Sequence, residues 1–416
     1  MPEIPRDPLP ESTLALIRDP YRFISKRCER YRSDFFETTL MFQRTLCMRG
    51  REAAALFYSP QRFARAGVAP MWLQKTLFGV GGVQGLDGEA HRHRKQMLMS
   101  LMTPERIERL AHITSEYWRV ALGKWVRQKR VVLYPELREI LTRAVCDWAG
   151  VPPTESEVKQ RTYQLTAMFD QAAAIGLGHF LSRRARRQAE QWITDVIEAI
   201  RAGRYHAPVE SAAHVIAWHR DASGALLDRH TAAVELINVL RPTVAVSVYM
   251  TFVAVALHQY PACQQPLRTG ETDYAEAFVQ EVRRFYPFFP LVMAQARDDF
   301  AWKGYHFQKG TKVALDLYGT NHDARIWKEP EAFRPERFLG WDGDPFSLIP
   351  HGGGDAHRHH RCPGELIAID LMKVALSFFT RRIAYELPEQ NLTIDYRRLP
   401  ALPRSRFILR NVREMG

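Results

Sequence analysis

The loop at residues 351–365 gathers residue types that bind metals. It reads HGGGDAHRHHRCPGE, and the apolar segment that follows Pro363 has the periodicity of a helix. A cysteine at the N-terminus of a helix meets the positive end of the helix dipole, which stabilises the thiolate, the form that ligates metals. We therefore expect Cys362 to be a thiolate ligand, with Pro363 opening the helix behind it.

Two other interpretations of this loop stay open. Cys362 could be a buried cysteine that happens to precede a helix, or the histidines of the loop could bind zinc. The histidines are His351, His357, His359 and His360. Their spacing matches no closed tetrahedral pattern, and no second cysteine stands nearby, so zinc is the weaker interpretation.

A second unusual position lies in the most apolar stretch of the chain. Between residues 233 and 257 the only ionisable side chains are Glu235 and Arg241, and Pro242 follows the arginine. A buried guanidinium without a partner is costly, and a proline removes a helical hydrogen bond. Glu235 and Arg241 are six residues apart, so they do not share a helix face. The Arg241–Pro242 pair therefore needs a functional explanation.

Two motifs of charged residues lie between these positions. In EVRRF, Glu281 and Arg284 are one helical turn apart and can pair on one face. In FRPERF (333–338), Arg337 can join them in a buried network of three side chains.

The elements that must position these residues are mainly helical. Helical periodicity is clear at 104–126, behind Thr103 as N-cap, and at 183–203. We interpret 233–257 as a core helix that Pro242 kinks locally. Strand signals are few: a hairpin over 304–318 that turns at Lys309–Gly310, and a strand within 401–412. The sequence predicts a mainly α fold (α+β) with small peripheral sheets, as a single domain over 1–416.

Composition narrows the class of protein. The chain has 46% apolar and 25% charged residues and a net charge of +12, and its basic runs, such as SRRARRQ (182–188), are short and scattered. No zinc-finger or RNA-recognition motif is present, so we expect a solvated surface and no nucleic-acid partner. The five widely spaced cysteines suit a reducing compartment. The polar N-terminus and the arginine within the apolar run indicate a cytoplasmic protein without stable membrane insertion.

The order of E-x-x-R, P-E-R-F and a cysteine loop before a helix resembles the cytochrome P450 superfamily, over essentially the whole chain. The resemblance implies haem b with Cys362 as its thiolate ligand and a structural role for Glu281, Arg284 and Arg337. It also implies that the segment GLDGEAHRHRKQM (85–97) contacts the haem propionates, through His91 and Lys95 on one helix face. Arg65 is a weaker candidate for the same role.

The sequence departs from ordinary members of the superfamily in two places. They carry an acid–threonine pair in the distal helix, where this chain has Arg241–Pro242, and its cysteine loop carries extra residues where a redox partner would dock. Both departures resemble the fatty-acid peroxygenase branch. The resemblance implies that hydrogen peroxide is used directly, without a redox partner, and that the carboxylate of a long-chain fatty acid pairs with Arg241 and serves as the acid–base group.

The same resemblance indicates which residues surround the acyl chain. These residues are Phe78, Val83, Gln84, Phe288 and Phe289. A second ring at Phe289 should bring the α carbon nearest the oxidant, which favours α- over β-hydroxylation. Gln84 should leave decarboxylation minor, since decarboxylating relatives carry histidine there. A reductase-dependent monooxygenase and a haem-binding protein without turnover remain the alternatives.

Overall fold

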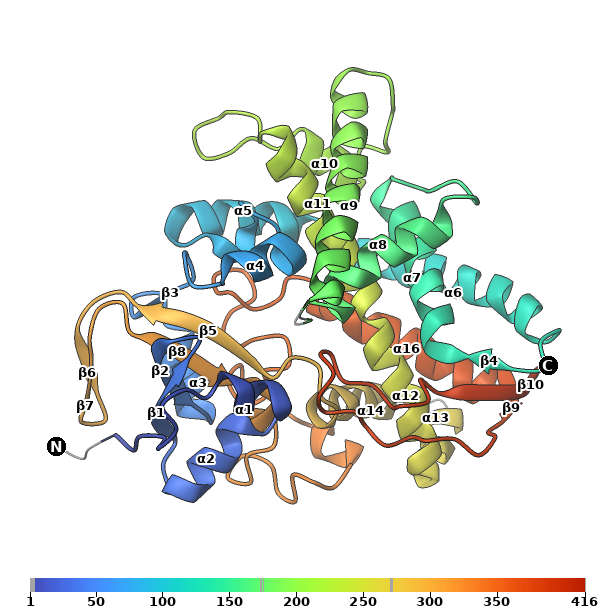
Figure 1. Ribbon diagram of the computed structural model, residues 1–416. Helices are drawn as coiled ribbons and strands as arrows, with labels where there is room; N and C mark the ends of the chain where they lie inside the picture. Colours follow the sequence, from blue (N-terminus) through green and yellow to red (C-terminus); the bar gives the residue numbers. More distant parts are fainter. Residues whose placement is uncertain (1–3, 173, 175, 270–271, 416) are drawn as a thin grey trace.

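The computed structural model describes residues 4–172, 174, 176–269 and 272–415, and helices make up most of them, with the strands gathered in small peripheral sheets (Figure 1). The helices are α1 (Thr13–Arg18), α2 (Phe23–Tyr31), α3 (Arg51–Phe57), α4 (Met71–Leu73), α5 (Gly88–Ser100), α6 (Pro104–Trp125), α7 (Leu133–Ala149), α8 (Val158–Asp170), α9 (Leu177–Arg201), α10 (Ala212–Ala217), α11 (Arg229–Ala245), α12 (Ser247–Gln259), α13 (Gln264–Thr269), α14 (Thr272–Phe285), α15 (Leu317–Asn321) and α16 (Glu365–Arg381). Short π and 3₁₀ turns are η1 (Gln74–Phe78), η2 (Val83–Gly85), η3 (Pro261–Cys263) and η4 (Pro335–Phe338).

The strands form three separate sheets. The strands are β1 (Phe35–Leu40), β2 (Gln43–Met48), β3 (Phe63–Ala64), β4 (Val131–Val132), β5 (Leu291–Ala296), β6 (Phe300–Trp302), β7 (Tyr305–Phe307), β8 (Lys312–Asp316), β9 (Ile383–Glu386) and β10 (Ile408–Glu414). One sheet has the order β1-β2-β8-β5-β3, another β4-β10-β9, and β6 pairs with β7 alone. Only β2 and β8 run parallel. The predicted C-terminal strand is β10.

The predicted hairpin at Lys309–Gly310 is wrong. The hairpin is formed by β6 and β7 and turns at Lys303–Gly304, where both residues have positive φ, of 50° and 80°. That conformation matches the twist of paired strands in a two-residue turn. Gly310 also has a positive φ, but its turn only redirects the chain from β7 to β8, which pairs with β5 and β2 instead.

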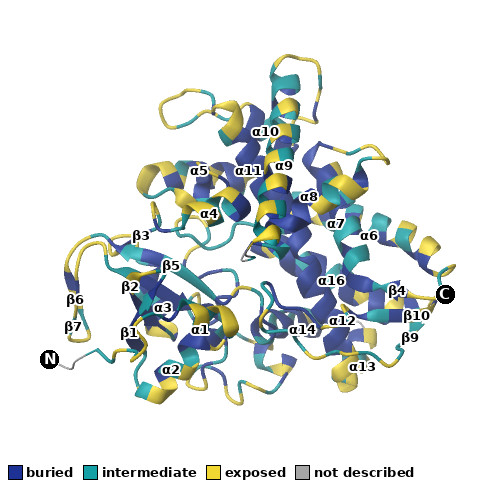
Figure 2. Cartoon of the chain, in the orientation of Figure 1, coloured by how far each residue is buried: buried dark blue, intermediate teal, exposed yellow. Residues whose placement is uncertain are grey.

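The predicted core helix is two helices. α11 ends at Ala245 and α12 begins at Ser247, and the Val246 N–H donates to the Thr243 carbonyl at 3.2 Å, one residue short of the α-helical spacing. Pro242 lies inside α11, one turn before this interruption. Residues 229–259 are long and apolar enough to cross a membrane, but 94% of their most apolar window is buried in the fold. Figure 2 shows both helices dark blue among α7, α8, α9 and α16.

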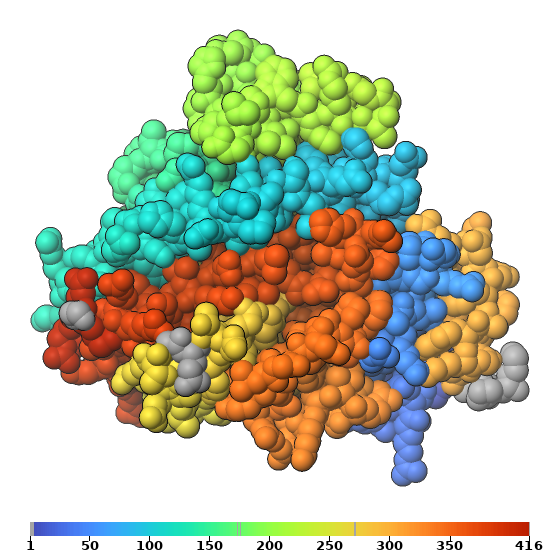
Figure 3. Space-filling view, turned by 180° about the vertical axis from the view of Figure 1, so that it is seen from behind, coloured from blue at the N-terminus to red at the C-terminus, as the bar shows by residue number. Residues whose placement is uncertain are grey.

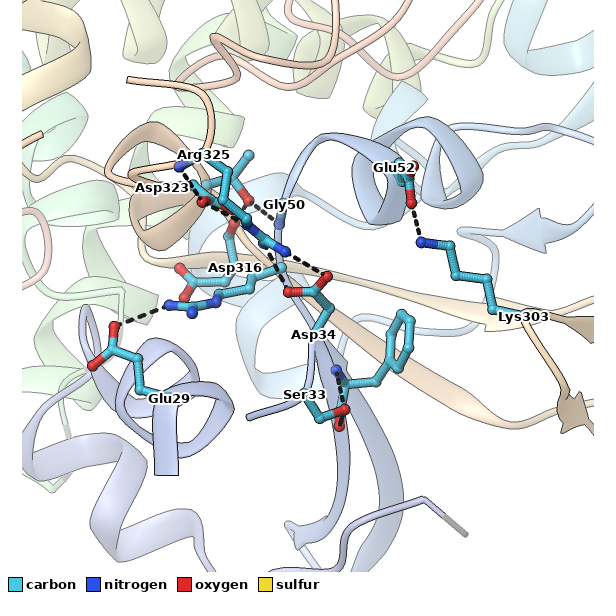
Figure 4. Close-up of polar contacts among 12 residues, drawn as sticks. Glu29, Ser33, Asp34, Gly50, Glu52, Lys303, Asp316, Asp323 and Arg325 are labelled. Atoms are coloured by element: carbon cyan, nitrogen blue, oxygen red, sulfur yellow. Dashed lines mark hydrogen bonds and ion pairs between the residues drawn. The ribbon is translucent and has the colours of Figure 1, made fainter. Parts of the chain in front are cut away.

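A bidentate ion pair fastens the N-terminal sheet to the segment after α15. Arg325 donates to both carboxylate oxygens of Asp34, at 2.7 and 2.8 Å, and also binds Asp323 (Figure 4). Beside it, the Gly50 N–H donates to Thr320 Oγ1 at 3.0 Å. These contacts join the start of β1 to residues 320–325, which lie next to the network described below.

The structure brings Glu281, Arg284 and Arg337 together. Glu281 and Arg284 are fully buried and pair at 2.7 Å, and Arg337 Nε lies 3.2 Å from the Glu281 carboxylate. Glu281 also accepts from the Arg334 backbone N–H at 2.7 Å. Arg284 donates to the carbonyl of Asn321 at 3.0 Å. These contacts hold η4 against α14, and so they position the chain that leads into the cysteine loop. Seen from behind, that chain and α16 form adjacent bands (Figure 3).

Replacing Arg284 by methionine should strongly destabilise the fold. The change leaves the fully buried Glu281 carboxylate with only part of its hydrogen bonds, and removing one partner of a buried ion pair costs about 3–5 kcal/mol. Denaturant unfolding measures the loss. Arg334→Met is the matched control, because its partner Glu329 is exposed and such a pair contributes under about 1 kcal/mol. Equal losses in both variants would contradict a buried network.

Candidate active site

Cys362 lies just before α16, at the point where the cysteine loop meets the interior. Its backbone N–H donates to the His351 carbonyl at 2.8 Å. The helix begins at Glu365, so the expectation that Pro363 opens it is wrong: Pro363 and Gly364 form a turn, and Gly364 is the N-cap. Cys362 is therefore two residues outside the helix, and the Gly364 N–H points to its sulfur.

The surroundings of Cys362 differ from those of the other cysteines. Cys28, Cys47, Cys146 and Cys263 are buried, whereas Cys362 keeps accessible surface. Burial nevertheless raises the pKa of the Cys362 thiol, while the Lys95 charge and the Gly364 N–H act in the opposite direction. The helix terminus is therefore not the only influence on this thiol, since burial acts against it.

Helix α5 presents His91 and Lys95 to the cysteine loop. The Lys95 ammonium donates to the backbone carbonyls of His359, at 3.3 Å, and Arg361. The His91 ring lies 3.9 Å from the His360 ring, centroid to centroid. The two side chains share one face, as their spacing predicts, and this face is buried against the loop.

The Lys95 ammonium has no carboxylate partner in the part of the chain that the structure describes. Burial lowers the pKa of Lys95 to about 8, so it stays largely protonated near pH 7, and lowers that of His91 to about 3, so His91 is a neutral hydrogen-bonding group there. Arg65 stacks on Phe57, 4.3 Å from the ring centroid, and donates to the Met293 carbonyl at 2.8 Å. A buried ammonium without an anion is costly. The donor set of one cysteine sulfur and unpaired cations near it fits haem, whose propionates carry two negative charges.

The loop histidines point to different partners. His351 Nδ1 contacts Arg283 at 3.1 Å, His359 accepts from the Asp355 N–H at 2.8 Å, and His360 lies 3.6 Å from Asp87. Among the described residues no group of three or more His, Cys, Asp or Glu side chains could hold a metal ion. The zinc interpretation of the loop is therefore not supported by their placement.

Arg241 is buried on α11 and is only 5% exposed. Its Nη2 donates to Asn238 Oδ1 at 3.3 Å, while its buried Nε has no hydrogen-bond partner among the described residues. Burial lowers the pKa of Arg241 to about 9; the Arg186 charge lowers it further and the Cys362 charge acts to raise it. Arg241 is thus near enough to Cys362 for their charges to interact, and it lacks an anion of its own.

Asn238 links Arg241 to a buried polar network that sequence reasoning missed. Its amide nitrogen donates to Gln84 Oε1 at 3.2 Å and to Glu235 Oε2 at 3.3 Å. Glu235 pairs with Arg94 at 2.8 Å and does not contact Arg241. The available signal was the position of Asn238, three residues from both Glu235 and Arg241, which lets it contact each of them although those two do not share a face. Arg94 and Arg186 come from distant helices and gave no such signal.

The residues expected around the acyl chain occupy two regions. Phe78 and Val83 flank the glycine-rich turn before α5, and Gly82 in that turn lies against Asn238 and Gln84. Phe288 stacks on Tyr249 with ring centroids 4.7 Å apart, and Tyr249 faces His351 of the cysteine loop.

Phe289 is placed differently. It is 37% exposed and packs edge-on against Phe288, with centroids 4.8 Å apart. Phe289 thus lies beside the ring that stacks on Tyr249, and its place in the acyl pocket stays a prediction.

Comparison with known proteins identifies close structural relatives. Cytochrome P450SP alpha in complex with (R)-ibuprofen has 52% identity and a TM-score of 0.96, over 98% of this chain and 100% of that one. Cytochrome P450EX alpha with myristic acid has 42% identity and a TM-score of 0.97, over 100% of both chains. A variant of cytochrome P450 OleT in complex with arachidonic acid has 33% identity and a TM-score of 0.97, over 100% of this chain and 99% of that one.

Sequence comparison alone finds a shorter likeness. The family model for cytochrome P450 matches residues 268–409. Norfluorocurarine oxidase from Strychnos is 29% identical over 126 residues, which are 29% of this chain and 24% of that protein. Steroid 17-alpha-hydroxylase/17,20 lyase from Ictalurus punctatus is 36% identical over 125 residues, 29% of this chain and 24% of that protein. The chain thus matches about a quarter of the length of these curated relatives. The region that the family model matches contains the motifs at Glu281, Arg337 and Cys362.

Lys95→Met should weaken haem binding while the fold survives. The variant removes a buried ammonium that no protein carboxylate balances, and a hydrogen bond to a charged group contributes about 1.5–3 kcal/mol, or at least tenfold in affinity. The rate at which haem passes to an acceptor protein measures the change. Lys129→Met is the control, because Lys129 is exposed and far from the loop in sequence. Haem retention equal to wild type in Lys95→Met would contradict a role for Lys95 at the propionates.

Proposed function

The chain belongs to the cytochrome P450 family, and from this premise we propose that it is a single-domain haem-thiolate peroxygenase that hydroxylates long-chain fatty acids next to their carboxylate. The observation that carries the proposal is Arg241, a buried cation without an anionic partner among the described residues, whose charge interacts with that of Cys362. A fatty-acid carboxylate is the missing anion. The solved relatives support this assignment, since ibuprofen, myristic acid and arachidonic acid all carry a carboxyl group.

Haem b is the cofactor that the family implies, ligated by Cys362, and when bound it supplies the iron at which the O–O bond of peroxide is cleaved. His91 and Lys95 would hold its propionates, with Arg65 beside them. Glu281, Arg284 and Arg337 act on the loop and touch no reacting atom. They are structural residues.

Arg241 has two tasks in this account. Its guanidinium binds the substrate carboxylate through charge-assisted hydrogen bonds, which positions the acid. The carboxylate held there is an acid–base group that can carry a proton from one oxygen of hydrogen peroxide to the other. Because Pro242 has no N–H, the Asn238 carbonyl lacks the hydrogen bond that an α-helix would give it. This weakens the helical hydrogen bonding beside the proposed position of the substrate carboxylate. The substrate supplies the acid that ordinary members of the family carry in the protein.

The sizes of two interaction energies indicate which part of the substrate determines its affinity and which part determines its position. A buried CH₂ is worth about 0.8 kcal/mol, so the tail of a fourteen-carbon acid contributes on the order of 10 kcal/mol before the costs of binding. One ion pair at 4 Å contributes about 4 kcal/mol at an effective dielectric of 20. The tail therefore dominates affinity, whereas Arg241 decides which carbon is presented for reaction.

Pinning the carboxylate restricts the reaction to the carbons beside it. We propose α-hydroxylation in preference to β-hydroxylation, with Phe289 as a second ring beside Phe288 that brings the α carbon nearest the oxidant. Gln84 accepts a hydrogen bond from Asn238, so it belongs to the network behind Arg241, and we expect little decarboxylation. Phe78 and Val83 complete the proposed acyl pocket.

The proposal needs no electron donor. Hydrogen peroxide brings both the oxygen atom and the oxidising equivalents, so a C–H bond and peroxide give an alcohol and water without a net proton or electron. We therefore propose that the protein works without a redox partner, in the cytoplasm, with the 229–259 stretch serving as its core.

Arg241→Ala should lower peroxide-driven turnover of myristic acid at least about a hundredfold, with haem content unchanged. The variant removes the group that holds the carboxylate, and a positioned acid–base group is worth 10²- to 10⁴-fold in rate. A short carboxylic acid added to the variant should restore turnover of a small neutral substrate, because it supplies the missing carboxylate. Arg229→Ala on the same helix is the control, since that side chain is exposed. Wild-type turnover of myristic acid by Arg241→Ala would refute the role of Arg241.

Myristic acid and hydrogen peroxide should give mainly the 2-hydroxy acid, with less 3-hydroxy acid and little 1-alkene. Methyl myristate should remain unchanged, because the ester has no anion for Arg241. Mass spectrometry of the products tests both statements. Mainly 3-hydroxy acid or alkene would overturn the assignment of the α carbon. Turnover that requires a reductase and NAD(P)H, with none from dilute peroxide, would favour an ordinary monooxygenase.

A further inference from the structure

The first part of α9 carries an exposed stripe that the proposed reaction does not use. Leu177 and Phe180 are 72% and 55% exposed, and Arg184 and Arg187 follow on the same side of the helix. The spacing of three, four and three residues keeps all four within one face. Neither arginine forms an ion pair or a side-chain hydrogen bond within the described residues. The helix therefore presents an apolar end followed by two free positive charges.

A second element extends this surface. Trp72 of α4 lies against His179 of α9, with ring centroids 6.2 Å apart, and Figure 2 shows exposed residues on both helices. Met71 and Trp72 are exposed large apolar side chains, and Lys75 is exposed and unpaired among the described residues. The sequence has no Asp or Glu between residues 66 and 86 or between residues 171 and 189. The surface is thus apolar at its tip, basic around it and free of acidic side chains.

We propose that this surface, formed by residues 71–75 and 177–187, docks the protein on an anionic lipid bilayer. Leu177, Phe180 and Trp72 would enter the boundary between head groups and acyl chains, with Arg184, Arg187 and Lys75 at the level of the phosphates. Apolar side chains beside Lys and Arg are the composition of elements that lie in a membrane interface. Leu177 and Arg187 are ten residues apart, about 15 Å along the helix. The apolar and the basic side chains would therefore lie at different depths in the membrane interface.

The exposed apolar side chains Leu177 and Phe180 favour a bilayer over a nucleic acid as the binding partner of this surface. A nucleic-acid backbone would use the arginines but would leave Leu177 and Phe180 exposed to water. A bilayer would contact both the arginines and the apolar side chains. Docking would favour the proposed reaction, because long-chain fatty acids partition into membranes. The segment 71–78 connects the docking surface to Phe78 of the proposed acyl pocket. The docking surface stands on its own residues, so it does not depend on the identity of the substrate.

The test is binding of the haem-loaded protein to vesicles, measured by co-sedimentation without any turnover. The protein should bind vesicles that contain phosphatidylglycerol, bind phosphatidylcholine vesicles far more weakly, and be released by salt. Arg184→Glu/Arg187→Glu should weaken binding at least about 25-fold, because each basic residue near an anionic surface contributes about fivefold. Leu177→Ser/Phe180→Ser should weaken it at least about tenfold.

Matched controls carry the same changes elsewhere. Arg127→Glu/Arg130→Glu changes the net charge equally, and Val120→Ser removes an exposed apolar side chain from α6. Both controls should bind vesicles as wild type does, and all variants should keep the haem spectrum and thermal stability of wild type. Equal loss in the controls, or no preference for anionic vesicles, would overturn the proposal. It would also be overturned if duplex DNA bound through Arg184 and Arg187 while Leu177→Ser/Phe180→Ser changed nothing.

Discussion

The cost of burying a positive charge without an anion is the constraint on which this structure depends. Arg241 is almost fully enclosed, its pKa is lowered to about 9 by burial, and among the described residues its only side-chain acceptor is the neutral amide of Asn238. A second cation, Arg186, lies near enough to lower the pKa further. Such an arrangement is tolerable only because the surrounding fold is stable enough to hold it, and it is relieved when an anion enters.

The same imbalance recurs at the cysteine loop. Lys95 is a buried cation with a lowered pKa that faces the loop instead of a carboxylate, and the neutral ring of His91 lies beside it on the same helix. The available acids are already engaged, Glu235 with Arg94 and Glu365 with Arg283 and Arg361. The protein thus balances its structural charges internally and leaves unbalanced cations where the family binds haem propionates and where we propose a substrate carboxylate. The unpaired charges mark the site more clearly than any single motif does.

The sequence predicted the parts of this site that depend on local order. Helix α6 and the pairing of Glu281 with Arg284 follow from spacing along one helix, and the cysteine before α16 follows from its motif. The hairpin at Lys303–Gly304 was missed, because turn conformations at glycine depend on tertiary contacts. The interruption at Val246 follows Pro242, which removes a helical hydrogen bond and was expected to kink the helix. Arg94 could not be found, since its pairing with Glu235 joins residues 141 positions apart.

A crystal structure of the haem-loaded protein with myristic acid would test the central claim most directly. The account predicts that both carboxylate oxygens lie within hydrogen-bonding distance of the Arg241 guanidinium, on the open side of the iron that Cys362 ligates. A carboxylate bound elsewhere, with Arg241 turned away from the metal or paired with Glu235, would contradict it.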